Sequence, residues 1–425
     1  MALSYSGVWR AGTDGYYLWG NANQAGFLAK WNELSNANMR LVDFETVSVG
    51  GGRQWNGVWR AGSDGHYLWI NADWNGFVSK WTELAKGGLR LTTVRSYTDG
   101  GAQLFAGVWR AGTDGYYLWG NADWNGFAAK WSELSNANMR LADFDTYEVG
   151  GNRLWVGTWR SGSDGHYLWA NADWPNFLSK WQELAKSNLR LTRFKQYKIG
   201  NEWRYAGVWR AGTDGYYLWV NASWDSFVAK WQELAAQNLR LIHLHVQPVG
   251  TIPTVRMHLK VLTQPTIPLD TMVRRMREVY ESYGLRVEVA SSETLNLPAL
   301  NDCDVGQCVS GSTTAEQNQL FGNRNNVGTN EVVAYFVRST VPPFNGCAAY
   351  PSGRPGAVIV QGATQWTLAH EMGHVLGLPH CDSEGARLFD RLMTGGGTAN
   401  ITNPPPDLIA SEVQTMRDSS YSIDV

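Results

Sequence analysis

The chain has 425 residues, 44% of them hydrophobic and 17% charged, which is typical of a globular protein of two or three domains with a sizeable core. The formal net charge of −2 excludes the basic surface that binding to nucleic acid or to an anionic membrane requires. No apolar run reaches the roughly 18 residues that span a bilayer, so we expect no membrane span.

Residues 1–249 consist of five tandem repeats of 50 residues without insertions. The period is marked by tryptophans that keep the same register: Trp9, Trp59, Trp109, Trp159 and Trp209. Of the 23 tryptophans, only Trp366 lies beyond residue 250, so composition and periodicity change at the same place. We therefore expect two domains, residues 1–249 and residues 250–425.

The third repeat illustrates the expected elements. Residues 107–119 predict two strands joined as a hairpin by the turn at Asp114-Gly115. Residues 121–138 carry apolar side chains at helical spacing, and residues 140–149 alternate like a strand. Gly150-Gly151 then turns the chain into the next repeat. The expected blade combines the last strand of one repeat with the first two strands of the next.

This arrangement predicts that the two ends of the repeat array pair. The last strand of the fifth repeat, residues 240–249, has no following repeat, and the first strand, residues 4–11, has no preceding one. Pairing them removes both exposed edges, and five blades lie within the usual range of roughly four to eight. The predicted fold of residues 1–249 is a closed, propeller-like ring of five blade-plus-helix repeats.

The repeated tryptophans are best explained as packing between blades, and Arg10 and its equivalents as partners of turns like the one at Asp14. Two more variable sets are our candidates for a surface that binds carbohydrate or protein. One stays aromatic while changing type: Tyr5, Trp55, Phe105, Trp155 and Tyr205. In the other, Gln24 of the first repeat is replaced by tryptophan: Trp74, Trp124, Trp174 and Trp224.

The segments GVWRAG, DGYYLW and FxxKWxEL resemble the bacterial tandem-repeat family, whose repeats also form the N-terminal domain of fungal polyglycine hydrolases. The resemblance covers all of residues 1–249. It implies a propeller-like ring beside a hydrolase domain, and it implies no function for the ring itself.

Residues 250–425 predict a domain of mixed helices and strands. Strands are expected at residues 256–262, 285–290, 331–337 and 356–360, and helices at residues 268–284, 367–376 and 406–418.

All four cysteines lie in this second domain: Cys303, Cys308, Cys347 and Cys381. An even number in one region suggests two disulfides and an oxidising destination, with three possible pairings. We favour Cys303 with Cys308 and Cys347 with Cys381, while a rival interpretation makes Cys381 a metal ligand. We expect secretion, although residues 1–4 lack the start of a signal peptide, so either a leader was removed or export uses another route.

Residues 370–380 read HEMGHVLGLPH. On a helix, His370 and His374 lie one turn apart and project the same way, with Glu371 beside them. Gly377 accepts a left-handed turn that can deliver His380 as a third ligand. Three histidines leave the fourth position of a tetrahedral Zn²⁺ open for water.

The string resembles, at every defining position, the HExxHxxGxxH signature of the metzincin metalloproteases. That family also has a methionine in a tight turn beneath the zinc, and the resemblance assigns this role to Met393, 13 residues after His380. Gly395 stands where some metzincins have a zinc-contacting tyrosine, so a tyrosine switch is not expected. The resemblance implies an α+β catalytic domain.

We therefore expect a secreted, monomeric zinc endopeptidase in which Glu371 accepts a proton from water and passes it to the leaving amine. A protein or peptide substrate is expected to lie extended along an edge strand near Gly346, at Cys347, Ala348, Ala349 and Tyr350. The pocket for the residue after the cut is expected between the site helix and residues 394–403. The alternative is an adhesion or lectin-like binding protein whose metal domain is vestigial or regulatory.

Overall fold

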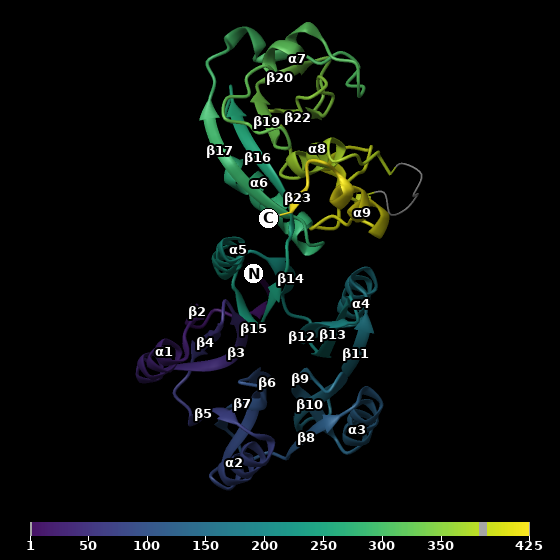
Figure 1. Ribbon diagram of the computed structural model, residues 1–425. Helices are drawn as coiled ribbons and strands as arrows, with labels where there is room; N and C mark the ends of the chain where they lie inside the picture. Colours follow the sequence, from purple (N-terminus) through teal and green to yellow (C-terminus); the bar gives the residue numbers. More distant parts are fainter. Residues whose placement is uncertain (1, 382–388, 425) are drawn as a thin grey trace. The chain divides into compact units, whose positions relative to one another are not determined.

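The computed structural model describes residues 2–381 and 389–424, which form two compact units (Figure 1). One unit holds the chain up to Trp219 together with Phe227–Pro248, and the other holds Val220–Ser226 together with the chain from Val249 onward. No helix among the described residues has both the length and the apolar character that crossing a membrane demands.

The five repeats share one order of elements: long strand, short strand, helix, long strand. The first strands are β1 (Ala2–Ala11), β4 (Gly52–Ala61), β7 (Ala102–Ala111), β10 (Asn152–Ser161) and β13 (Glu202–Ala211). The short second strands are β2 (Tyr16–Ala22), β5 (His66–Ala72), β8 (Tyr116–Ala122), β11 (His166–Ala172) and β14 (Tyr216–Ala222). The third strands are β3 (Met39–Val49), β6 (Leu89–Asp99), β9 (Met139–Val149), β12 (Leu189–Ile199) and β15 (Leu239–Val249).

The helix of each repeat lies between its second and third strands, and these helices are α1 (Gln24–Asn36), α2 (Trp74–Lys86), α3 (Trp124–Asn136), α4 (Trp174–Lys186) and α5 (Trp224–Ala236). Their ends follow from local chemistry. In α3, for example, the Asp123 side chain accepts a hydrogen bond from the Gly126 N–H, which caps the first turn. Asn138 then takes a left-handed conformation at φ 56°, which asparagine tolerates better than most residues and which ends the helix.

Each sheet combines strands of neighbouring repeats, but the predicted grouping is wrong, because the second strand of a repeat lies in the same sheet as the third strand of that repeat. Each is three-stranded, and the first strand of one repeat lies between the second and third strands of the preceding repeat: β2-β4-β3, β5-β7-β6, β8-β10-β9 and β11-β13-β12. In the fifth sheet, β1 lies between β14 and β15. The helix of each repeat packs on the sheet that holds the second and third strands of that repeat. In Figure 1 the helices lie toward the outside of this unit and the third strands toward its middle.

The predicted hairpin at Asp114-Gly115 is wrong, because β7 and β8 belong to different sheets. The true hairpin turn is Gly150-Gly151, where Val149 pairs with Asn152 and both glycines have positive φ, 56° and 78°. Asp114 instead binds the guanidinium of Arg160 in the next repeat, with Arg160 Nε 2.6 Å from Asp114 Oδ2. The Asp-Gly pair thus connects two sheets and does not fold one strand back on the other.

The same Arg–Asp contact links every repeat to the one before it, as expected for Arg10 and its equivalents. The arginine Nε lies 2.6–2.8 Å from the aspartate Oδ2 in all five pairs: Arg60–Asp14, Arg110–Asp64, Arg160–Asp114, Arg210–Asp164 and Arg10–Asp214. In each aspartate, the hydrogen bond from arginine is the main cause of a lowered pKa.

The recurring tryptophans are core residues, as predicted: Trp9, Trp59, Trp109, Trp159 and Trp209 are each 0% exposed. The first set proposed as a binding surface is buried as well, namely Tyr5, Trp55, Phe105, Trp155 and Tyr205. These side chains pack against helix residues such as Phe27, whose ring centre lies 5.5 Å from that of Trp55. Their change of type therefore reflects repacking of a core. The second set is half-buried, and Trp74 packs edge-on against Phe105 at 5.0 Å.

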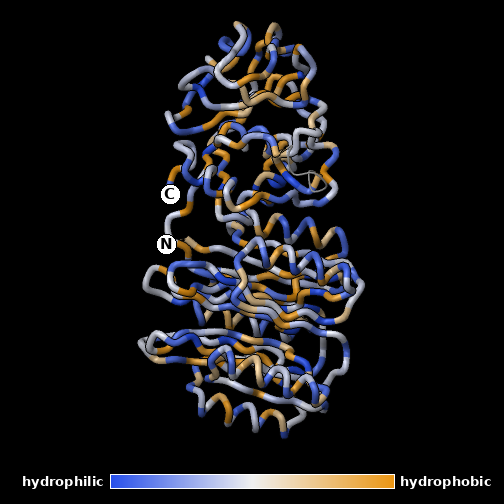
Figure 2. The backbone as a smooth tube through the Cα atoms, turned by 90° about the vertical axis from the view of Figure 1, so that its right-hand side faces the viewer, coloured by the Kyte–Doolittle hydropathy of each residue, from blue (hydrophilic) through white to orange (hydrophobic). Residues whose placement is uncertain are grey.

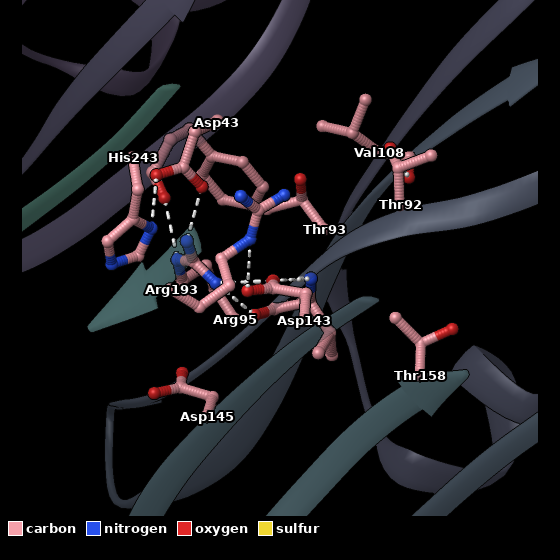
Figure 3. Close-up of polar contacts among 12 residues, drawn as sticks. Asp43, Thr92, Thr93, Arg95, Val108, Asp143, Asp145, Thr158, Arg193 and His243 are labelled. Carbon is pink, nitrogen blue, oxygen red and sulfur yellow. Dashed lines mark hydrogen bonds and ion pairs between the residues drawn. The ribbon is translucent and has the colours of Figure 1, made fainter. Parts of the chain in front are cut away.

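Charged side chains of the third strands meet in a fully buried ionic cluster (Figure 3). Arg95 lies between Asp43 and Asp143, with Arg95 Nη1 2.7 Å from Asp143 Oδ2. Nearby, Lys195 Nζ lies 2.6 Å from Glu45 Oε2. Burial alone would raise the pKa of Asp43, but the attraction of Arg95 and other cationic neighbours lowers it to about 2. The cluster thus joins charged side chains from several repeats in the interior of this unit.

The second compact unit is built on a mixed sheet of order β17-β16-β19-β22-β21. It comprises β16 (Pro253–Val261), β17 (Arg286–Thr294), β19 (Val332–Val337), β22 (Gly356–Val360) and β21 (Gly346–Cys347). The first four run parallel, whereas β21 is an edge strand antiparallel to β22. Strands β19 and β22 are buried along their whole length, as parallel strands covered on both faces are, and Figure 2 shows hydrophobic residues recurring along the strands.

Helices and short elements complete this unit. The helices are α6 (Leu269–Ser282), α7 (Ala315–Leu320), α8 (Thr367–Val375) and α9 (Ala410–Asp418), with 3₁₀ turns at Pro298–Leu300 and Thr398–Asn400. The short strands are β18 (Asp302–Asp304), β20 (Ser339–Val341) and β23 (Ile423–Asp424). Tyr280 of α6 donates a hydrogen bond to the Ala369 carbonyl of α8 over 2.7 Å, which fixes the two helices against each other in one core.

The predicted disulfide pairing is wrong. Cys308 is bonded to Cys347, with their Cα atoms 5.7 Å apart, and Cys303 and Cys381 are buried thiols. The reason is that Cys303 pairs with Thr340 in the β18–β20 ladder and is held in the core. The chain then turns at Gly306, φ 54°, which directs Cys308 away from Cys303 and toward the edge strand β21.

Candidate functional site

Helix α8 positions the first two histidines, as the spacing predicts. His370 lies in the buried middle of α8 and His374 in its last turn, and their Nε2 atoms are 3.1 Å apart. Residues four apart on a helix share a face, so this closeness is set by the local sequence alone.

The third histidine arrives through the turn that ends α8. Gly377 has φ 102°, the Leu378 N–H donates to the Gly373 carbonyl over 3.0 Å, and the Gly377 N–H donates to the His374 carbonyl over 3.0 Å. This is a Schellman-type ending, which needs a residue that tolerates positive φ. It brings His380 Nε2 to 3.0 Å from His374 Nε2 and 3.3 Å from His370 Nε2.

The three imidazoles fit a metal ion. His370 Nδ1 lies 2.7 Å from the Leu392 carbonyl and His374 Nδ1 2.7 Å from the Leu378 carbonyl, so each Nδ1 carries the proton and each Nε2 presents a lone pair. The lone pairs of His370 and His374, whose Nε2 atoms are 3.1 Å apart, repel each other unless a cation lies between them. Tetrahedral ligands at about 2.0–2.1 Å from a zinc ion would be about 3.3 Å apart. His370, His374 and His380 could therefore hold a metal ion.

Met393 packs against helix α8, which carries two of the histidines. It is fully buried, and a Cβ placed on Gly373 of α8 would come 2.6 Å from its sulfur. The Met393 carbonyl accepts a hydrogen bond from the Cys381 N–H over 3.0 Å, and the preceding Leu392 N–H donates to the Asp407 carbonyl. The turn at Met393 is thus fixed both to the segment that carries His380 and to the segment that leads into α9.

Glu371 is buried beside the histidines, and no described residue forms a hydrogen bond with its carboxylate. Burial raises the pKa of Glu371 to about 8. Its closest constraint is Gly346 of β21, where an added Cβ would lie 2.6 Å from Glu371 Oε1. The carboxylate is therefore held between the site helix and the edge strand.

A cavity of about 1050 Å³ contains the three histidines and Glu371. Gly346, Ala348, Ala349 and Tyr350 line it, whereas Cys347 does not, because its side chain points into the core and carries the disulfide. The expected substrate strand is thus only partly available: β21 ends at Cys347, and the Ala349 carbonyl already accepts a hydrogen bond from the buried Gln317 side chain over 2.9 Å. The predicted metal ligands, Glu371 and Met393 are all brought together.

Sequence reasoning missed one wall of this cavity. The residues are Gln307, Cys308, Ser310, Arg338, Ser339 and Phe344. They come from two segments without a recognisable motif, which the disulfide and the β18–β20 pairing bring to the cleft. The cysteines were the available signal, but their pairing was needed to use it.

Comparisons with known proteins bear on the first unit. A family model described as the structural repeat of polyglycine hydrolase-like proteins matches residues 14–61, 68–111, 114–161 and 169–211. The N-terminal part of the chain thus consists of polyglycine hydrolase-like structural repeats. No curated protein matches the chain. A solved structure of Drosophila Piwi is 6% identical over 80% of this chain and 59% of its own, with a TM-score of 0.13, and therefore carries no argument about fold.

Proposed function

We propose that residues 250–425 form a metzincin-like zinc endopeptidase. The observation that carries the proposal is that three histidine Nε2 atoms share one cavity with the buried carboxyl group of Glu371, which has no hydrogen-bond partner among the described residues. Three nitrogen ligands with a position open to solvent suit a catalytic zinc better than a structural one, whose four positions are filled by the protein. His380, the exposed member of the triad, provides that open side.

A zinc ion held there supplies Lewis acidity that activates water and polarises a substrate carbonyl. Glu371 is placed to accept the proton of the attacking water and to return it to the leaving amine. The edge strand β21 can pair with an extended peptide and present the scissile bond to Glu371, since Gly346 lies against that carboxylate. The carbonyls of Leu392 and Leu378 hold the histidine rings in the required orientation.

We also propose that the five repeats close into a ring that targets or presents the peptidase. The position of β1 between β14 and β15 supports this, as does the contact of Arg10 with Asp214, which repeats the contact made between all other neighbours. The Cys308–Cys347 disulfide supports an extracellular location. The alternative, an adhesion protein with a vestigial metal domain, has lost one of its two candidate surfaces, because the first aromatic set is buried.

The test combines metal analysis with proteolysis. Purified wild-type protein should contain one zinc per chain and should cleave casein, and Glu371→Ala should keep the zinc but lose activity by about 10²–10⁴-fold. Glu288→Ala, which removes a partly exposed carboxylate outside the cavity, is the matched control and should retain full activity. A zinc-loaded wild type that cleaves nothing, or a fully active Glu371→Ala protein, would contradict the proposal.

A further inference from the structure

One wall of the cavity adjoins Glu371 and is built from small, uncharged residues. Thr367 lies one helical turn before Glu371 on the same face of α8. The rest of this wall comes from the end of β22 and from the segment after Met393. We call it the threonine wall; its cavity-lining members are Val360, Gly362, Thr367, Thr394, Gly397 and Thr398.

Three hydroxyls bind one another at the base of the threonine wall. Thr364 Oγ1 lies 2.7 Å from Thr398 Oγ1 and 3.1 Å from Thr367 Oγ1, and the last two atoms are 2.9 Å apart. Three hydroxyl groups arranged in this way can form a closed cycle in which each donates once and accepts once. All three protons are then used within the cycle.

Only one oxygen of the cycle keeps a lone pair for a ligand. The backbone N–H of Thr364 donates to Thr367 Oγ1 over 3.0 Å, and the N–H of Trp366 donates to Thr364 Oγ1 over 3.3 Å. These two oxygens are saturated, since a hydroxyl oxygen accepts at most two hydrogen bonds. Thr398 is 6% exposed and lines the cavity, so its Oγ1 offers one acceptor site.

Thr394 offers the complementary group. Its hydroxyl oxygen accepts a hydrogen bond from the Gly396 N–H over 3.2 Å, but within the described part of the chain its proton has no acceptor. Thr394 is 1% exposed and lines the same wall, so the unused donor is directed at buried space. Leaving such a donor unsatisfied costs about 1–3 kcal/mol, which a bound ligand or a water molecule recovers.

The wall also excludes charge. None of its six residues is ionisable, so a carboxylate entering it would be desolvated without a counter-ion from the wall and would lie close to the Glu371 carboxyl group. Space is available for more than a methyl group, because a Cβ placed on Gly362 or Gly397 meets no atom within 4 Å. A purely apolar side chain would fit but would leave the Thr394 proton unpaired.

We propose that the threonine wall is the specificity pocket of the peptidase and takes an uncharged side chain that both donates and accepts hydrogen bonds, a carboxamide or a hydroxyl, from the substrate residue beside the scissile bond. This inference rests on the proposed peptidase function, because a specificity pocket presupposes a peptide that is cleaved. It concerns peptide binding, however, and can be measured without hydrolysis.

The binding experiment uses zinc-loaded Glu371→Ala, which cannot complete the reaction. Hexapeptides of alanine with blocked ends carry Asn, Asp or Leu at one position at a time, three side chains of nearly equal size. Isothermal titration calorimetry should find one position at which Asn binds about tenfold more tightly than Leu and more than tenfold more tightly than Asp. Equal binding of all three at every position, tighter binding of Leu or Asp, or no binding at all would overturn the inference.

Variants that lack a hydroxyl group test whether Thr398 forms a hydrogen bond with the Asn side chain of the peptide. Thr398→Val should lower the Asn-to-Leu ratio, because the acceptor for the amide N–H is removed while the Thr394 donor remains, and Thr398→Ser should restore the preference. Thr402→Val, an exposed threonine outside the cavity, is the matched control and should behave as the parent protein. Melting temperatures show that each variant is folded, and a Thr398→Val protein that keeps the full Asn preference would overturn the assignment.

The two proposals fail in different ways. If zinc-loaded wild type cuts no peptide while Glu371→Ala still prefers Asn, the peptidase proposal falls and the pocket stands. If wild type cuts a mixed peptide library, and sequencing of the products shows Asp, Glu, Lys, Arg or Leu beside the cut as often as Asn, Gln, Ser or Thr, the peptidase stands and the pocket falls.

Discussion

Two glycines shape the candidate site as much as its charged residues do. Gly373 lets α8 approach the sulfur of Met393, and Gly346 lets the edge strand approach Glu371, in each case so closely that a Cβ would come within 2.6 Å. Neither glycine has positive φ, so each is needed for space and not for backbone conformation. Single residues without functional groups thus fix where the Glu371 carboxylate lies.

Gly346→Ala should therefore displace the Glu371 carboxylate without touching a metal ligand. We expect kcat/KM for casein-derived peptides to fall about 10–100-fold while zinc content stays at the wild-type level, because a shift of about 1 Å in a catalytic group is costly. Gly250→Ala, at a glycine with open space around it, should have no effect. A Gly346→Ala enzyme with wild-type kinetics would show that this contact does not position Glu371.

At the scale of elements, the Cys308–Cys347 bond joins a cavity-lining loop to the edge strand across a sequence separation of 39 residues. Closing a loop of this length lowers the entropy of the unfolded chain enough to contribute about 4 kcal/mol. Cys308→Ser should lower the free energy of unfolding of the second unit by about this amount, measured by urea denaturation. The double variant Cys308→Ser/Cys347→Ser should cost no more than the single one, and a clearly larger loss would indicate a separate packing role for the second sulfur.

The Arg–Asp contacts between repeats make stability depend on pH. Hydrogen bonds from arginine lower the pKa of Asp14 and its four equivalents in the folded state, so their contribution is fully present above the unfolded pKa of about 3.9. It is lost as the pH falls through the lower, folded pKa, because the unfolded chain takes up protons first. The contribution of these five contacts to the free energy of unfolding should be constant between pH 7 and pH 5 and should decrease below about pH 4.

Urea titrations at pH 7, 5, 4 and 3 measure this dependence. Tryptophan fluorescence reports on the repeats, since all tryptophans except Trp366 lie in residues 1–249. Asp64→Asn removes one of the titrating contacts and should flatten the curve, while Asp73→Asn, at an exposed helix cap outside these pairs, should not. A slope that is identical in wild type and Asp64→Asn would contradict the assignment.

At the scale of the whole repeat array, every repeat of a closed ring has two neighbours, so each contact between repeats should contribute equally to the free energy of unfolding. The contact of Arg10 with Asp214 then equals the contact of Arg110 with Asp64, and both Arg10→Ala and Arg110→Ala should lower the free energy of unfolding by about 1 kcal/mol. In an open array, Arg10→Ala would cost nothing. The two variants are matched in residue type and contact, so denaturation curves followed by tryptophan fluorescence distinguish the two arrangements.

Local sequence patterns predicted the long elements of the second unit and missed the short ones. The sequence predicted most helices and strands of the second unit within a few residues, including β22 and the start of α8, and the Gly150-Gly151 hairpin, because capping, periodicity and turn chemistry act within about ten residues. It missed the short elements α7, β18, β20 and β23, which are too short to show a period and depend on contacts with distant parts of the chain.

The sequence by itself determined the repeat period and the buried tryptophans, which recur every 50 residues. It also determined the convergence of His370, His374 and His380, because helix geometry and a single glycine turn act within these eleven residues. Only the tertiary structure decided which strands pair across repeats, that Asp114 binds a neighbouring arginine, and that Cys308 bonds Cys347. It also decided that the threonines of α8 and of residues 394–398 share one wall. The physical reason is distance along the chain: such contacts are chosen by the packing of the whole core, which no local pattern records.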